Sequence, residues 1–267
     1  MRRLTVVAVG FVAAAAAAMP GWAADGAIDW EGYGAFGISL LPDYDGSKDY
    51  EGLPYIEARL NTGNYYAWID GNDLRFNLID DGHFHAGPTI GIRRGRQVVD
   101  NAAISRLPHF DDMMSTGAFV EYENIHDDPR AGERVTLIAD DGVINVSGGW
   151  VVTLRGEIHR PLDFIDPGFI VSLEADANWA DRDYMRTYYG VTPAASAASG
   201  LPAFDPSSGF DSVGAALSFD QFLSRHWDVG MRFHYARLTG GAAASPVTAL
   251  VGSADQYFLA LVAGYAL

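Results

Sequence analysis

The chain has 267 residues, no cysteine, and 34 acidic against 18 basic side chains, which gives a formal net charge of −16. The lack of cysteine excludes disulfides, thiolate nucleophiles and zinc–sulfur sites, and the acidic balance argues against a nucleic-acid partner. The length suffices for one large β domain.

The first predicted element is a secretory signal peptide over residues 1–23. Arg2 and Arg3 form a basic start, an uncharged apolar stretch runs from Leu4 to Ala18, and small residues lead to a cleavage point after Ala23. No other segment approaches the ~20 apolar residues that a spanning helix requires. We therefore expect an exported mature domain over residues 24–267.

The mature chain consists of runs in which apolar and polar residues alternate, as in WDVGMRFHYARL at 227–238 and GWVVTLRGEIHR at 149–160. Successive side chains of a strand point to opposite faces, so each run predicts a strand with one apolar and one polar face. Repeated behind a secretion signal, this pattern is typical of a transmembrane barrel in an outer membrane. The predicted strands are 30–40, 50–60, 64–70, 73–79, 84–95, 115–124, 132–140, 148–159, 168–178, 210–221, 227–238 and 255–267.

These ranges make an all-β, antiparallel barrel of about twelve strands, or eleven if 64–79 were one bulged strand. With the N-terminus in the periplasm, twelve strands leave short turns on the periplasmic side. The long connections 96–114, 179–209 and 239–254 then fall outside, where outer-membrane barrels carry theirs. The Pro-rich, small-residue stretch 190–209 reads as a surface loop and, alternatively, as a gate that folds into the mouth.

Alternation also predicts which charged side chains point into the lumen. Both signs occur, which favours ion pairs across strands and a largely closed lumen, with a small-solute channel as the alternative. The candidate lumen residues are Glu57, Arg59, His85, Arg93, Glu121, Glu123, Arg155, Glu157, Glu174, Asp176, Asp228, Arg232 and His234.

Four segments, in order, resemble the MipA/OmpV family of outer-membrane proteins. They are LPDYDGSKDYEGLP after the first strand, HAGPTIGIRRGR, the long stretch from WADRDYMRTYYGV to SGFDSVG, and the last hairpin from HWDVGMRFHYARL to GSADQYF. The chain departs from the family in ending on Leu267 where an aromatic residue is usual. The residues that carry the two loop motifs are Pro42, Asp43, Tyr44, Gly46, Ser47, Tyr184, Met185, Tyr188, Tyr189, Gly190 and Val191.

The resemblance implies a non-enzymatic scaffold in the cell outer membrane, in contact with lipid and lipopolysaccharide. In this family the namesake is described as bridging a lytic transglycosylase, MltA, and a bifunctional penicillin-binding protein during peptidoglycan assembly. Other members are described as surface antigens or adhesins, which keeps an adhesin open as an alternative.

Catalysis, cofactors and metal ions are not expected from the sequence. An outer-membrane phospholipase of the Ser-His-Asn type is the main enzymatic alternative. However, alternation predicts that the side chains of the strand histidines His85, His159 and His234 all point into the lumen, and no G-x-S-x-G motif occurs. The acidic groups of the outer loops, such as Asp43, Asp45 and Asp49, read as solvated carboxylates because no calcium-loop pattern is present.

Overall fold

The computed structural model describes residues 31–96, 99, 101–143 and 148–267. The predicted signal peptide lies outside this range and stays a prediction. Twelve strands form one closed antiparallel barrel in which each strand pairs with its sequence neighbours and β1 pairs with β12. The strands are β1 (Glu31–Pro42), β2 (Tyr50–Thr62), β3 (Tyr65–Asp70), β4 (Asp73–Asn77), β5 (Phe84–Arg93), β6 (Met113–Ile125), β7 (Gly132–Gly142), β8 (Trp150–Pro161), β9 (Phe169–Ala180), β10 (Gly209–Phe222), β11 (Trp227–Leu238) and β12 (Asp255–Ala266).

The twelve predicted ranges are confirmed, with boundaries that shift by a few residues. The region 64–79 is two short strands joined by a hairpin whose turn contains Gly71 at φ 58°, so the eleven-strand alternative is wrong. Pairing of β1 with β12 closes the sheet, and closure leaves no strand edge with unpaired backbone groups facing lipid. Alternation works because the outer face meets lipid while the inner face meets water and charge.

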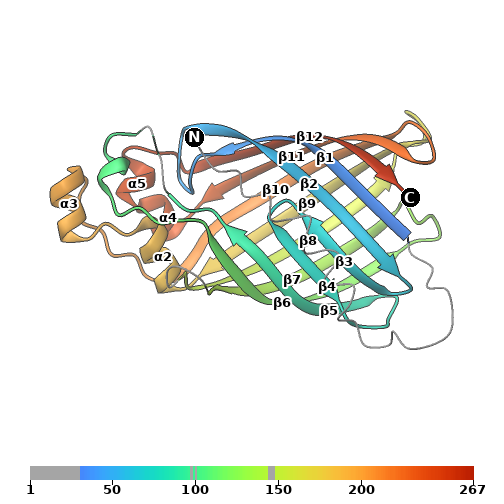
Figure 1. Cartoon of the computed structure of the whole chain (residues 1–267), viewed down its shortest axis with the longest axis horizontal. Coiled ribbons are helices and arrows are strands. Elements are labelled where there is room, and N and C mark those ends of the chain that lie inside the picture. Colours follow the sequence, from blue (N-terminus) through green and yellow to red (C-terminus); the bar gives the residue numbers. More distant parts are fainter. Residues whose placement is uncertain (1–30, 97–98, 100, 144–147) are drawn as a thin grey trace.

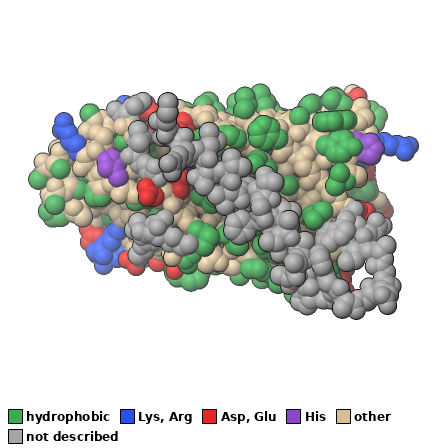
Figure 2. All heavy atoms as spheres, viewed as in Figure 1, with side chains coloured by type: hydrophobic (Ala, Val, Ile, Leu, Met, Phe, Trp, Pro, Cys, Tyr) green, Lys and Arg blue, Asp and Glu red, His purple; other side chains and the backbone are tan. Residues whose placement is uncertain are grey.

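The outer wall is apolar. Phe36, Ile38, Val120, Leu154 and Leu261 are all among the exposed large hydrophobic side chains. Figure 2 shows hydrophobic side chains along the visible wall, with charged side chains mainly towards the two ends. An exposed apolar band around a closed barrel is the arrangement that a bilayer stabilises, so the chain is a membrane-spanning barrel. The described residues include no helix that is long and apolar enough to cross a membrane.

The two ends of the barrel differ. The turns after β2, β4, β6, β8 and β10 are short, and the start of β1 at Glu31 and the C-terminal Leu267 lie at the same end as these turns. The opposite end carries the long connections, whose described residues form four helices and one 3-10 turn; the helices are labelled in Figure 1. They are η2 (Ile104–Arg106), α2 (Arg182–Tyr189), α3 (Pro193–Ser199), α4 (Gly240–Ala244) and α5 (Pro246–Ala249).

The helix α3 is a feature of the stretch 190–209 that its interpretation as a surface loop did not include. Thr192 caps its first turn by accepting from the Ala195 amide, Pro193 follows at the first helical position, and Gly200 ends it at φ 80°. Proline at the start and a left-handed glycine just after the end are the usual signals of a helix. A stretch so rich in small residues and proline is also typical of a loop, so its composition alone does not predict α3.

Candidate functional site

The extracellular end of the barrel carries a cap, which we define as residues 43–49, the described part of 94–112, 181–208 and 239–254. Two apolar clusters hold these connections together. The first joins α2 to α4 and the barrel rim, and the second joins the β1–β2 hairpin to the 3-10 turn, α3 and α5. The lumen cavity described below is lined by none of these cap residues. Residues 190–209 do not line the cavity, and α3 lies beyond the strand ends (Figure 1), so the alternative of a gate that folds into the mouth stays a prediction.

The helix α2 supplies most of the first cluster. Asp181 caps it by accepting from the Tyr184 amide at 2.9 Å. The spacing of Tyr184, Met185, Tyr188 and Tyr189 places all four on one face, and their exposed fractions lie between 0% and 7%. Burial raises the pKa of the Tyr184 phenol well above its ordinary value, so this phenol stays protonated.

The two motif segments meet within the cap. The Tyr184 hydroxyl donates to Asp45 at 3.1 Å, and the Tyr188 hydroxyl donates to the Arg94 carbonyl at 3.2 Å. The Tyr189 carbonyl accepts from Ser245 Oγ at 2.6 Å. Gly190 ends α2, and Val191 forms a backbone bridge with residue 204. These contacts hold residues 184–189 against the other segments of the cap.

The β1–β2 hairpin is fastened to the far end of the chain. The Gly46 amide donates to Gln256 Oε1 at 3.2 Å, and Gln256 Nε2 donates to the Ser47 carbonyl at 3.0 Å. Gly46 has φ 89°, and a Cβ there would lie 2.7 Å from Thr248 Oγ1, so both backbone and space require glycine. The remaining motif residues fit the same hairpin: Pro42 accepts from Arg94, the Asp43 amide bonds to Asp49, and Tyr44 is buried.

An exposed ion pair braces the cap on its outer side. Arg186 Nε and Arg182 Nη2 donate to the two oxygens of Asp205 at 2.6 and 2.8 Å. The hydrogen bond from Arg186, with a smaller contribution from Arg182, lowers the pKa of the Asp205 carboxyl to about 2.

Below the cap lies a cavity of about 1000 Å³ that reaches the periplasmic end, where Glu31, Asn61 and Leu267 line it. The candidate lumen residues that line this cavity are Glu57, Arg59, Arg155, Glu157, Glu174, Asp176, Arg232 and His234. The predicted cross-strand pairs occur here. Arg155 lies 3.2 Å from Glu174, Arg232 bridges Asp220 and Glu57 at 2.7 and 3.2 Å, and His234 meets Asp176 at 2.7 Å.

The other candidate lumen residues point inward but do not line the cavity. Arg93 lies beneath the cap, 2.6 Å from Asp140, with its guanidinium 5.3 Å from the Tyr184 ring centre. Asp228 is buried and accepts from Tyr33 at 3.0 Å. His85, Glu121 and Glu123 are buried against the wall between β5 and β6.

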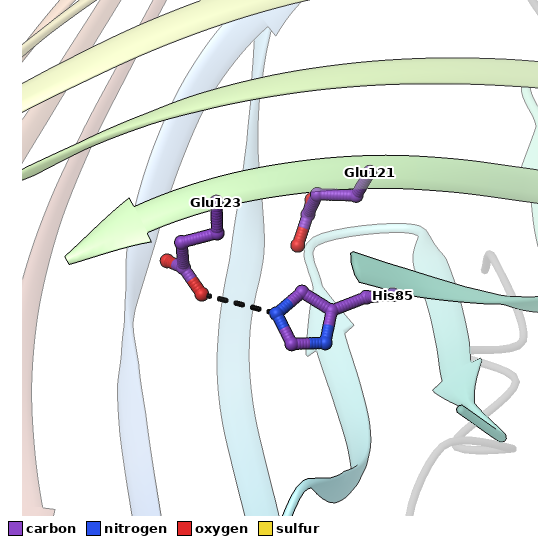
Figure 3. Close-up of side chains that lie close together, drawn as sticks. All are labelled: His85, Glu121 and Glu123. Carbon is purple, nitrogen blue, oxygen red and sulfur yellow. Dashed lines mark ion pairs between the residues drawn. The ribbon is translucent and has the colours of Figure 1, made fainter. Parts of the chain in front are cut away.

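His85, Glu121 and Glu123 have metal-binding side chains whose ligand atoms lie within 4.8 Å of one another (Figure 3). Their partners do not suit a cation. Arg75 lies 3.7 Å from Glu121, and Arg134 lies 3.6 Å from Glu123. Glu121 also accepts from Tyr66 and Thr136 at 3.1 and 2.8 Å. Two guanidinium groups therefore already balance the two carboxylates, and they would repel a metal ion.

The tautomer of His85 also argues against a bound metal ion. The Asn77 side chain is fixed, since its Oδ1 accepts from two backbone amides and its Nδ2 donates to two carbonyls. That Nδ2 lies 3.1 Å from His85 Nδ1, and a donor there requires Nδ1 to be the unprotonated nitrogen. The proton is then on Nε2, facing Glu123 at 3.4 Å. A metal ion bound at Nε2 would move the proton to Nδ1, where it would face the Asn77 Nδ2 donor.

The inward residues that the sequence analysis missed include Trp68, Asp70, Asp73, Arg75, Arg134, Asp140 and Asp220, all of which line the cavity. The alternation of GERVTLIADD, with Val135 and Leu137 outside, places Arg134 inside and could have found it. Trp68 and Arg75 belong to strands of only six and five residues, where alternation is a weak signal.

Residues 34–267 match the model of the family described as MltA-interacting protein MipA. No curated protein matches the chain. Solved structures with a similar outline include the outer membrane channel DcaP of Acinetobacter baumannii, at 9% identity over 90% of this chain and 97% of that one, with a TM-score of 0.44. The COG4313 outer membrane channel from Pseudomonas putida F1 has 11% identity over 93% and 99%, also with a TM-score of 0.44. The family match spans nearly all of the described barrel, and the chain therefore belongs to the MipA family.

Proposed function

We propose that this barrel is a non-enzymatic scaffold that holds a lytic transglycosylase, together with a bifunctional penicillin-binding protein, at the periplasmic face of the outer membrane. The family description, MltA-interacting protein, supports such a partner. Because murein lies on the periplasmic side, the docking surface must lie on the short turns. The cap favours this direction, since it leaves the outer end covered by ordered chain.

The observation that carries the proposal is an apolar projection on the turn between β8 and β9. Phe164 is 84% exposed and Ile165 is 61% exposed, although both lie at the periplasmic end beyond the strands. Large apolar side chains that remain exposed on an ordered turn are typical of interaction sites.

This turn is held in a fixed conformation. Arg130, on the neighbouring turn between β6 and β7, donates to Asp163 at 2.9 Å and to the Pro167 carbonyl at 2.6 Å. The Ile165 amide also donates to the Leu162 carbonyl at 2.8 Å. A surface that is ordered before binding loses little conformational entropy when its partner docks.

The test is crosslinking of the tagged chain in intact cells, followed by identification of the captured proteins. We expect recovery of a lytic transglycosylase and a penicillin-binding synthase, and loss of both from the double variant Phe164→Ser/Ile165→Ser. The matched control is Leu223→Ser, because Leu223 is 64% exposed on a different periplasmic turn. Capture of neither enzyme by the unaltered chain would refute the scaffold, and equal capture by the double variant would place the docking surface elsewhere.

The cavity favours a second candidate, a small-solute channel. The cap would have to open for conduction, so single-channel recording should show silent barrels that conduct when the cap is loosened. An adhesin would instead use the outer surface of the cap, and it would lose host or surface binding when 190–209 is shortened.

A further inference from the structure

Three arginines surround a single tryptophan near the periplasmic end of the lumen. The guanidinium carbons of Arg75, Arg134 and Arg59 lie 4.2, 4.9 and 5.4 Å from the centre of the Trp68 ring. They come from β4, β7 and β2, and Trp68 comes from β3. All four side chains line the cavity. We call this group the Trp68 cluster.

Arg134 has hydrogen-bond donors to spare, whereas Arg59 Nε already donates to Asn61 at 2.9 Å. Nε and Nη1 of Arg134 have no hydrogen-bond partner among the described residues, although its side chain is nine-tenths buried. Its carboxylate contacts, to Glu123 and Glu157, are 3.6 and 3.8 Å long, and that of Arg75 to Glu121 is 3.7 Å. These distances are ion-pair distances, beyond the range of good N–H···O hydrogen bonds.

The balancing carboxylates lie mostly behind the arginines. Glu121 and Glu123 are buried in the wall and do not line the cavity, whereas the three guanidinium groups do. On this part of the wall a solute therefore meets guanidinium groups, while carboxylates such as Glu157 and Glu57 line other parts of the same cavity. Stacking on Trp68 holds the guanidinium groups in place, which lowers the entropy that each would lose on binding.

We propose that the Trp68 cluster is a binding site for a small solute with a carboxylate or phosphate group that enters from the periplasm. Arginine forks match the two oxygens of such a group bidentately. The cavity supplies the route, because it continues from the cluster to Glu31 and Leu267 at the periplasmic end. The site goes beyond the scaffold role and stands whether or not the periplasmic turns bind an enzyme.

The first experiment is isothermal titration of the full mature chain in detergent with inorganic phosphate and, separately, with acetate. It is run at an ionic strength of about 20 mM, where screening is weak. We expect saturable heat with at least one anion and weakening as sodium chloride is added. Arg134→Gln should weaken binding about tenfold or more, since a charge-assisted hydrogen bond is lost. The matched control is Arg237→Gln, whose ion pair with Asp255 lies on the exposed outer rim.

The second measurement guards against variants that do not fold. The unaltered chain should show a tryptophan fluorescence change on titration with the same anion, and Trp68→Phe should abolish it while retaining the folded, heat-modifiable form. Binding of phosphate alone would identify a phosphate site, acetate alone a carboxylate site, and both a general anion site. No heat and no fluorescence change with either anion in the unaltered chain would overturn the proposal, as would equal binding by Arg134→Gln.

Discussion

Replacing Met185 by alanine should loosen the cap without unfolding the barrel. The Met185 side chain is 0% exposed, lies in the first apolar cluster, and packs so closely on α4 that a Cβ on Gly241 would lie 3.1 Å from its Cε. Burial of this kind predicts a loss of about 2–5 kcal/mol on truncation to alanine. Because the strand ladders do not depend on this contact, the loss falls on the local opening of the cap.

Hydrogen exchange measures that opening. A loss of about 2 kcal/mol in the free energy of cap opening raises the open population about 25-fold, and a loss of about 5 kcal/mol raises it several thousandfold, since 1.4 kcal/mol is a factor of ten. The amides to follow are those of Met185 and Gly190, which donate to Asp181 and Arg186. The matched control is Leu250→Ala, because Leu250 is a cap residue that is 62% exposed. Exchange that stays unchanged in α2, or that rises equally in β9 and β10, would refute this account.

Three further perturbations test other parts of the structure. The hydrogen bond from Arg186 lowers the pKa of Asp205 to about 2, so this pair stabilises the cap above the ordinary aspartate pKa and stops doing so as the pH falls from about 4 to 2. Proteolysis of the cap should therefore become faster over that pH range. An Asp205→Asn variant that keeps the full pH dependence would contradict this cause. Gly46→Ala should destabilise the cap by about 1–2 kcal/mol because of the φ of 89° at this position, and hydrogen exchange in the cap should become faster. Gly52→Ala should leave cap exchange unchanged, because the nearest atom to its new Cβ would lie 3.7 Å away. Zinc titration should give the same heats for the unaltered chain and for His85→Ala, and a saturable heat that disappears with His85 would show that the buried cluster does bind metal.

The sequence was sufficient to predict the strands because a barrel wall imposes one strict rule. Lipid lies on one side of every strand and charge on the other, so the alternation of Val120 with Glu121 or Leu154 with Arg155 reports the fold directly. The short strands β3 and β4 are predicted from the loop lengths, because only twelve strands place all the long loops at one end. Alternation is a weak signal for them, since five or six residues give little periodicity.

The cap and the Trp68 cluster could not be predicted in the same way. Their contacts depend on the order of the strands around the barrel and on the tilt of each strand. The alternation of apolar and polar residues contains information on neither. The stacking of Arg59, Arg75 and Arg134 on Trp68 joins four strands, so no local window holds it. The two motif segments around Tyr44 and Tyr184, which the resemblance singled out, lie together in the cap, where Tyr184 donates to Asp45.

The bonds between Gly46, Ser47 and Gln256 also set an order of events during assembly. They join residues about 210 positions apart, across the seam where the first strand meets the last. Contacts at such separation form late, after the intervening chain is in place. The outer mouth is therefore sealed only when the seam is closed, and a barrel arrested before that step would remain an unsealed hole in the membrane. Retention of a protein at its insertion machinery until the seam closes would protect the cell from that leak.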